Sequence, residues 1–138
     1  MNTPRIPLLT LLAVSSLFAS LVRADEASYA KVLKERETVL SQILAAREVH
    51  FTTGGLDEEA VSSARLALWS FRRDTAPSTA EKIKEQELIV AVYEKKLATL
   101  KSRSATGVVG REDVLLATDS LLQAQQKLEE LKLKDKNG

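Results

Sequence analysis

The chain has no cysteine, one histidine, and few glycines, prolines or aromatic residues. Its 138 residues include five Gly and three Pro, and aromatic residues make up 4% of the total. Without cysteine there are no disulfides, no thiol chemistry, no thiolate metal site and no lipid-modified cysteine. The single histidine, His50, does not suffice for a zinc site, which takes several protein ligands. We therefore expect no metal and no cofactor.

Arrangements typical of enzymes are also missing from the sequence. The serines, such as Ser62 and Ser63, have no matched base for nucleophilic catalysis. The glycine pairs do not follow a strand and lack the lysine and hydroxyl of a phosphate-binding loop. The acidic pairs fall where helices are expected to begin, and the helix dipole explains them there. The sequence therefore predicts a non-enzymatic protein.

The only long apolar segment lies at the N-terminus. Arg5 precedes the apolar stretch 6–21, and Ala24 supplies the small residue that signal peptidase accepts. We expect a signal peptide over 1–24, cleavage after Ala24, and a periplasmic or secreted protein. An uncleaved anchor is the alternative, although the stretch is shorter than the roughly 20 residues of a spanning helix.

The predicted mature chain, residues 25–138, is nearly neutral. The full sequence has 20 basic and 19 acidic residues, so removing Arg5 and Arg23 leaves 18 basic against 19 acidic. Nucleic-acid binding requires a clustered basic face, which this balance disfavours. The length is that of one domain. We expect no membrane span in this part, no nucleic-acid partner and no small-molecule site.

The residues that remain abundant favour helices, and breaks in the pattern divide the chain into four. The first helix is expected over 25–53, ending at Gly54. Asp57 is expected to cap the second, which ends before Pro77. Ser78 and Glu81 form a capping-box pattern for the third, which ends at Gly107. The fourth is expected to start near Gly110 and to fray in its basic tail, the residues Lys132, Lys134, Lys136, Asn137 and Gly138.

Apolar residues recur with helical spacing along the last three helices. The expected core-facing positions are Val61, Ala64, Leu68 and Phe71, then Ile83, Gln86, Val90, Tyr93, Leu97, Leu100 and Ser104, then Val114, Ala117, Leu121, Ala124, Leu128 and Leu131. The run 88–93 is apolar throughout and resembles a strand. Its flanks are helical in pattern, so we predict a helix buried on more than one face.

A glycine turn occurs twice, 53 residues apart. Thr53 and Gly54 are echoed by Thr106 and Gly107, and nine of thirty positions are identical when 39–68 is placed on 92–121. Short turns force antiparallel neighbours. The sequence therefore predicts an all-α fold of two antiparallel helical hairpins, over about 25–74 and 78–133, in an up-down-up-down coiled-coil-like bundle with both glycine turns at one end.

The second turn resembles a motif of TolC-like outer-membrane efflux proteins, in their helical-hairpin portion. Arg103 is followed by Gly107 four positions later, then by an apolar pair, and then by Asp113-Val114. In that family the motif joins two long periplasmic helices, occurs in each of two internal repeats, and meets the hairpin of a periplasmic adaptor protein. The first turn departs from the motif, with His50 in place of the arginine and Ala60 in place of the aspartate.

The resemblance implies a set of partner-binding residues at the hairpin tips: Arg103, Gly107, Val108, Asp113 and Val114, with Gly54, Leu56 and Val61 as their echo. It implies an exported interaction or structural protein of the cell envelope, associated with an efflux or secretion assembly. Its partners would be envelope proteins or further copies of itself, reached through helix packing. The alternative is a periplasmic holdase-like chaperone, in which the run 88–93 contributes an exposed apolar patch.

Overall fold

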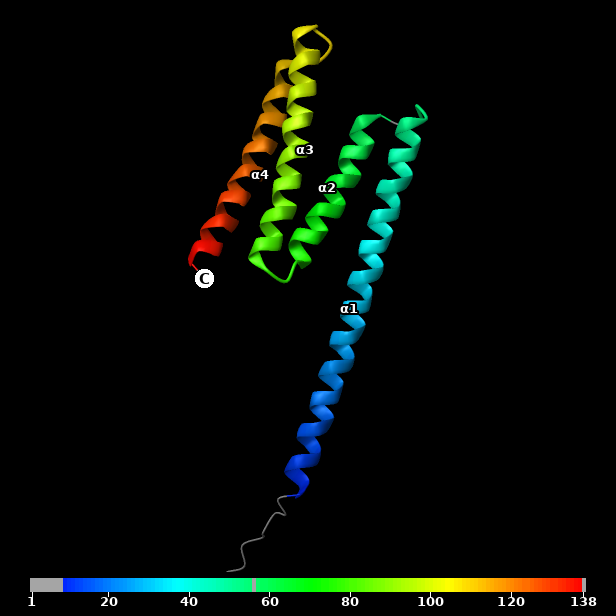
Figure 1. Ribbon diagram of the computed structural model, residues 1–138, viewed down its shortest axis with the longest axis vertical. Coiled ribbons are helices and arrows are strands. Elements are labelled where there is room, and N and C mark those ends of the chain that lie inside the picture. Colours follow the sequence, from blue (N-terminus) through cyan, green and yellow to red (C-terminus); the bar gives the residue numbers. More distant parts are fainter. Residues whose placement is uncertain (1–8, 56, 138) are drawn as a thin grey trace, which may run out of the picture. The chain divides into compact units, whose positions relative to one another are not determined.

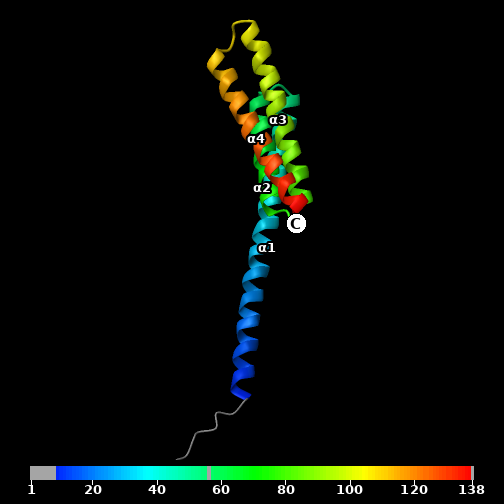
Figure 2. The same ribbon diagram turned by 90° about the vertical axis from the view of Figure 1, so that its left-hand side faces the viewer.

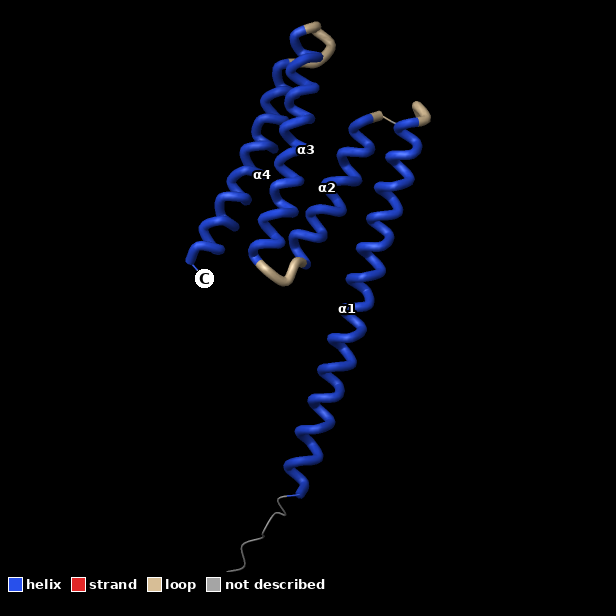
Figure 3. The backbone as a smooth tube through the Cα atoms, viewed as in Figure 1, coloured by secondary structure: helices blue, strands red, loops and turns tan. Residues whose placement is uncertain are grey.

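The computed structural model describes residues 9–55 and 57–137, with side chains from Asp25 onward. This part of the chain consists of four helices joined by short loops and contains no strand (Figure 3). They are α1 (Leu9–Thr52), α2 (Glu58–Thr75), α3 (Thr79–Ala105) and α4 (Arg111–Asn137). The predicted all-α fold class is confirmed, and the run 88–93 is helical.

The predicted helix boundaries of α2 and α3 are confirmed by their capping groups. The Asp57 carboxylate accepts a hydrogen bond from the Ala60 N–H at 3.0 Å. Ala76, which precedes Pro77, has left the helical conformation with ψ at 136°. At α3, the Ser78 hydroxyl oxygen accepts from the Glu81 N–H at 3.2 Å and the hydroxyl donates to the Glu81 carboxylate at 2.8 Å.

The ends of the described chain differ from the expected helix bounds in two ways. The backbone of α1 is helical from Leu9 in the full chain, because the leucines and alanines of this stretch are strong helix formers. The expected start at Asp25 is that of the chain after cleavage and stays a prediction. The predicted fraying of the α4 tail is wrong. The tail of α4 stays helical to Asn137, where lysines in the last turn favour the negative end of the helix dipole. In the part of the chain that the structure describes, no helix has the length and apolarity needed to cross a membrane.

Backbone contacts divide the chain into two units, one up to Arg36 and one from Glu37 onward. In the second unit, each helix runs antiparallel to its neighbour in sequence, and both glycine turns lie at the end opposite to the α2–α3 loop (Figures 1 and 2). Close backbone packing joins α2 to α3 and α3 to α4. The predicted up-down-up-down connectivity is confirmed, and α3 is a central helix with neighbours on two sides.

The core lies where α2, α3 and α4 meet. The four predicted positions of α2, from Val61 to Phe71, are all buried. Ile89 and Val90 of α3 contact Ala124 of α4, and partly buried side chains pack around them: Leu66, Trp69, Tyr93, Leu121 and Leu128. Burying a large aliphatic side chain contributes roughly 1.5–3 kcal/mol. This three-helix core is therefore the main source of stability in the second unit.

The run 88–93 is buried on more than one face, as predicted. Ile89, Val90 and Val92 are buried, whereas Leu88 is 42% exposed. Two neighbouring helices cover most of α3, and this placement explains why an uninterrupted apolar stretch is tolerated there. The expectation that this run forms an exposed patch is wrong for the same reason.

Helix α1 is attached differently. None of its described side chains, from Asp25 to Thr52, is buried. Arginines reach across between α1 and α2: Arg72 binds Glu37 at 2.8 Å and Arg65 binds Glu48 at 2.7 Å. The Arg47 guanidinium donates to the Ala60 carbonyl at 2.8 Å. Partly exposed ion pairs of this kind contribute little to stability.

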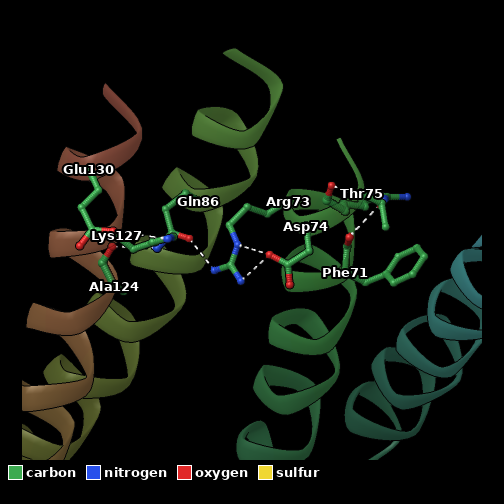
Figure 4. A network of polar contacts seen from close by, with 9 residues as sticks. Phe71, Arg73, Asp74, Thr75, Gln86, Ala124, Lys127 and Glu130 are labelled. Atoms are coloured by element: carbon green, nitrogen blue, oxygen red, sulfur yellow. Dashed lines mark hydrogen bonds and ion pairs between the residues drawn. The ribbon is translucent and has the colours of Figure 1, made fainter. Parts of the chain in front are cut away.

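A buried glutamine links the three core helices (Figure 4). Gln86 of α3 is 1% exposed. Its amide nitrogen donates to the Ala124 carbonyl of α4 at 2.7 Å, and its amide oxygen accepts from the Arg73 guanidinium of α2 at 2.8 Å. Arg73 also binds Asp74. Because each half of the amide has a partner, a polar group is accommodated in the core without an unsatisfied hydrogen bond.

Candidate functional site

The second glycine turn, between α3 and α4, closes with two backbone hydrogen bonds. The Val108 N–H donates to the Arg103 carbonyl at 3.0 Å, and the Gly107 N–H donates to the Ser104 carbonyl at 3.0 Å. Gly107 has φ of 73°, the left-handed conformation that side chains disfavour. This pair of bonds is a Schellman motif, which satisfies carbonyls left over at the helix end.

The first glycine turn, between α1 and α2, has the same bonds 53 positions earlier. The Gly55 N–H donates to the His50 carbonyl at 2.8 Å, and the Gly54 N–H donates to the Phe51 carbonyl at 3.0 Å. Gly54 has φ of 77°. The hydroxyls of Thr53 and Thr106 match as well, each accepted by the carbonyl three positions earlier. The two turns are therefore equivalent in backbone geometry.

The two turns differ in how the next helix begins. Asp57 caps α2 with its own carboxylate, which accepts from the Ala60 N–H. At α4 the capping position is Gly110, whose N–H instead donates to the Asp113 carboxylate at 3.2 Å. These are the two reciprocal halves of a capping box, one used in each turn. Asp113, predicted as a partner-binding residue, thus has a structural role at the start of α4.

A charged crevice of about 160 Å³ lies between the beginning of α2 and the end of α3. Its α2 side carries Asp57, Glu58 and Glu59, and its α3 side includes Arg103. Two ion pairs cross it: Lys95 binds Glu58 at 2.5 Å and Lys96 binds Glu59 at 2.7 Å. The crevice therefore brings the arginine of the second motif beside the cap of the first turn.

A second, larger crevice lies between α3 and α4 beside the Gly107 turn. Its volume is about 430 Å³, and its lining is Lys96, Leu100, Val109, Asp113, Leu116, Ala117 and Ser120. Leu116 is 60% exposed, and Val108 at the turn itself is 64% exposed. Apolar side chains left in water beside a crevice favour non-covalent binding of another apolar surface.

The predicted site residues separate into exposed and enclosed ones. Five are exposed at the two turns: Gly54, Arg103, Gly107, Val108 and Asp113. Val114 is half-buried. Val61 is 4% exposed and belongs to the core, so its side chain is not available to a partner. Leu56 lies outside the described residues.

The sequence reasoning missed Lys95, Lys96 and the exposed pair Leu115-Leu116. The lysines lie near the acids of α2 only because α3 packs against that helix. A signal for the leucines was present in the sequence. Val114, Leu115 and Leu116 are consecutive, and successive helical residues point about 100° apart, so one apolar stripe does not contain all three.

The groups gathered at the two turns are those named above: charged side chains, aliphatic side chains and exposed backbone. Among the described residues no three side chains of the kinds that hold metal ions come together. No protein-family model, curated protein or solved structure matches the chain.

Proposed function

We propose that this protein is a non-enzymatic helical interaction protein of the cell envelope, and that it docks to a partner through the tip of the α3–α4 hairpin. The observation that carries the proposal is the exposed apolar surface at that tip. Val108 is 64% exposed and Leu116 is 60% exposed, beside a crevice of about 430 Å³. Capping and turn geometry explain Gly107 and Asp113, but they give no reason for Val108 to lie in water.

The sequence supports the envelope location and the class of partner. The apolar stretch 6–21 followed by Ala24 has the form of a signal peptide, which favours export to the periplasm or beyond. The resemblance of the Gly107 turn to TolC-like hairpin tips supports a partner in an efflux or secretion assembly. The first turn, with His50 and Ala60 at the motif positions, is the weaker candidate.

The holdase-like alternative has less support from the burial of the side chains. The run 88–93 was expected to contribute an exposed apolar patch to it, and Ile89, Val90 and Val92 of that run are buried. We therefore retain the interaction protein as the proposed function.

Photo-cross-linking in intact cells tests the tip proposal. A photoreactive residue placed at Val108 should cross-link to another envelope protein. The same residue at Val49, 62% exposed next to the first turn, is the matched control and should not. Val108→Asp should reduce capture of the cross-linked protein, with unchanged helical circular dichroism. Equal cross-linking from the two positions, or none from Val108, would refute a specific role for the second tip.

A further inference from the structure

Helix α4 has leucines on the side opposite its buried face, with Asp119, Gln126 and Glu129 between them. Its inner face packs on α3 and contains Ala117, Ala124 and Leu131, all buried. Its outer face carries Leu115, Leu122 and Leu133, which are 58%, 57% and 59% exposed. Leu122 follows Leu115 by seven positions and Leu133 follows Leu122 by eleven, which are close to two and three turns at ~3.6 residues per turn.

Because of this spacing the three leucines share one side of α4, along most of its 27 residues. A surface helix normally has charged and polar residues opposite its buried stripe. Three leucines in line there are exposed apolar surface, which association with another apolar surface would remove from water. The row is also nearly symmetric about its middle, since one leucine lies close to each end of the helix. Such a row is complementary to a reversed copy of itself.

The charges at the two ends of α4 support the same arrangement. The first turn carries Glu112 and Asp113, and the last turn carries Lys134 and Lys136. Parallel pairing of two such helices would bring acid to acid and base to base, whereas antiparallel pairing brings acid to base.

We propose that the outer face of α4 binds a second copy of this chain, with the two α4 helices antiparallel. This surface is separate from the Val108 tip, so the inference does not depend on the proposed function.

In the register centred on Ala124, Leu115 lies beside Leu133 of the second copy. The two copies of Leu122 then lie on either side of the centre, ~6 Å apart along the axis at ~1.5 Å per residue. Glu112 faces Lys136 of the other chain. Asp119 and Glu129 meet as like charges, but Lys132 already binds Glu129 at 3.0 Å within its own helix.

The first test measures the mass of the full chain in solution by sedimentation equilibrium over a dilution series. The expected result is twice the mass of one chain. Leu122→Lys combined with Leu133→Lys should halve it, without loss of helical circular dichroism. Val49→Lys, a matched exposed aliphatic position on α1, should leave it doubled. A wild-type protein that has the mass of one chain at every concentration would overturn the proposal.

The second test measures direction and uses the absence of natural cysteine. Leu115→Cys and Leu133→Cys are prepared as separate variants, mixed, and treated with a short bis-maleimide. Antiparallel pairing predicts a cross-link between the two variants and loss of that cross-link when Leu122→Lys is added to both. A Leu115→Cys protein that cross-links mainly to itself would indicate parallel pairing and overturn the arrangement.

The outcomes separate this inference from the tip proposal. Val108→Asp should remain a dimer, and the Leu122→Lys and Leu133→Lys double variant should still cross-link to its envelope partner through position 108. A wild-type protein that is monomeric but cross-links through position 108 would refute only the dimer. A dimer without that cross-link would refute only the tip proposal.

Discussion

The α1–α2 and α3–α4 hairpins have turns with the same backbone hydrogen bonds but are held together by different side chains. Gly54 and Gly107 adopt nearly the same left-handed φ, 77° and 73°. Below the turns, α3 and α4 share a core with a buried glutamine, whereas α1 has no buried side chain among those described and binds α2 through arginines. Turn geometry depends on a few adjacent residues, whereas the packing of the helices depends on every neighbour.

A matched pair of leucine truncations should show the largest difference in stability between the two hairpins. Leu97→Ala in α3 removes a side chain that is 7% exposed, and we expect a loss of about 2–5 kcal/mol in the free energy of unfolding. Leu44→Ala in α1 removes a half-buried side chain, and we expect less than half of that loss, because much of Leu44 is already in water. Urea unfolding monitored by circular dichroism measures both. Equal losses would show that Leu44 of α1 is packed as firmly as Leu97 of α3.

Two adjacent arginines provide the next test. Arg73→Ala leaves the buried Gln86 oxygen without its partner, which should cost about 1–3 kcal/mol. Arg72→Ala removes the half-exposed pair with Glu37, which should cost roughly 0.2–1 kcal/mol and less in high salt, because exposed charges are screened. The measurement is thermal unfolding at low and high ionic strength. A larger effect of Arg72→Ala than of Arg73→Ala would show that the pair with Glu37 contributes more to stability than the hydrogen bond to Gln86.

The glycines should respond equally, because the turns are equivalent. Gly54→Ala and Gly107→Ala each place a side chain at positive φ with open space around it, so backbone strain of about 1–2 kcal/mol is the expected cost at both. Gly55→Ala is the control: the added carbon would lie 3.5 Å from the His50 carbonyl, an ordinary contact, and stability should change little. Unequal costs at Gly54 and Gly107 would show that the turns are not equivalent.

Smaller effects than at the glycines are expected at the caps, where the turns differ. Asp57→Ala removes the carboxylate that accepts from Ala60 and should cost about 1 kcal/mol. Asp113→Ala removes the reverse half of the capping box and should cost about 0.5 kcal/mol. The cost is smaller than at Asp57 because the hydrogen bond is longer, at 3.2 Å against 3.0 Å. Amide hydrogen exchange of the first turns of α2 and α4 locates each loss. Protection lost at α4 in Asp57→Ala, or at α2 in Asp113→Ala, would contradict these capping roles.

Much of the fold was predictable because the signals are local. Asp57, Ser78, Pro77 and the two glycines end or begin helices within a few residues of themselves, and the α2 stripe from Val61 to Phe71 required only the helical period. The wrong boundary lies at the C-terminal end of the described chain. There the lysines and leucines of the α4 tail favour helix, and no breaker stops it before Asn137.

The candidate site was predictable only in part. Gly107 and Val108 were identified at the tip, and both are exposed. Val61, matched to Val114 by sequence, is in the core instead, since α2 is covered on this side. The outer leucines of α4 were not identified, because a pattern assigned to one apolar stripe does not report on the opposite side of the helix.

The sequence alone was enough to place the beginnings and ends of α2 and α3, the like closure of the two turns and the buried face of α2, because these depend on backbone conformation and on neighbours within a few positions. The tertiary structure decided that α3 is central, that Gln86 is satisfied by Arg73 and Ala124, and that Val108 and the α4 leucines remain in water. Those outcomes depend on which helices come together, and contacts between residues distant in the chain are not encoded in any one segment.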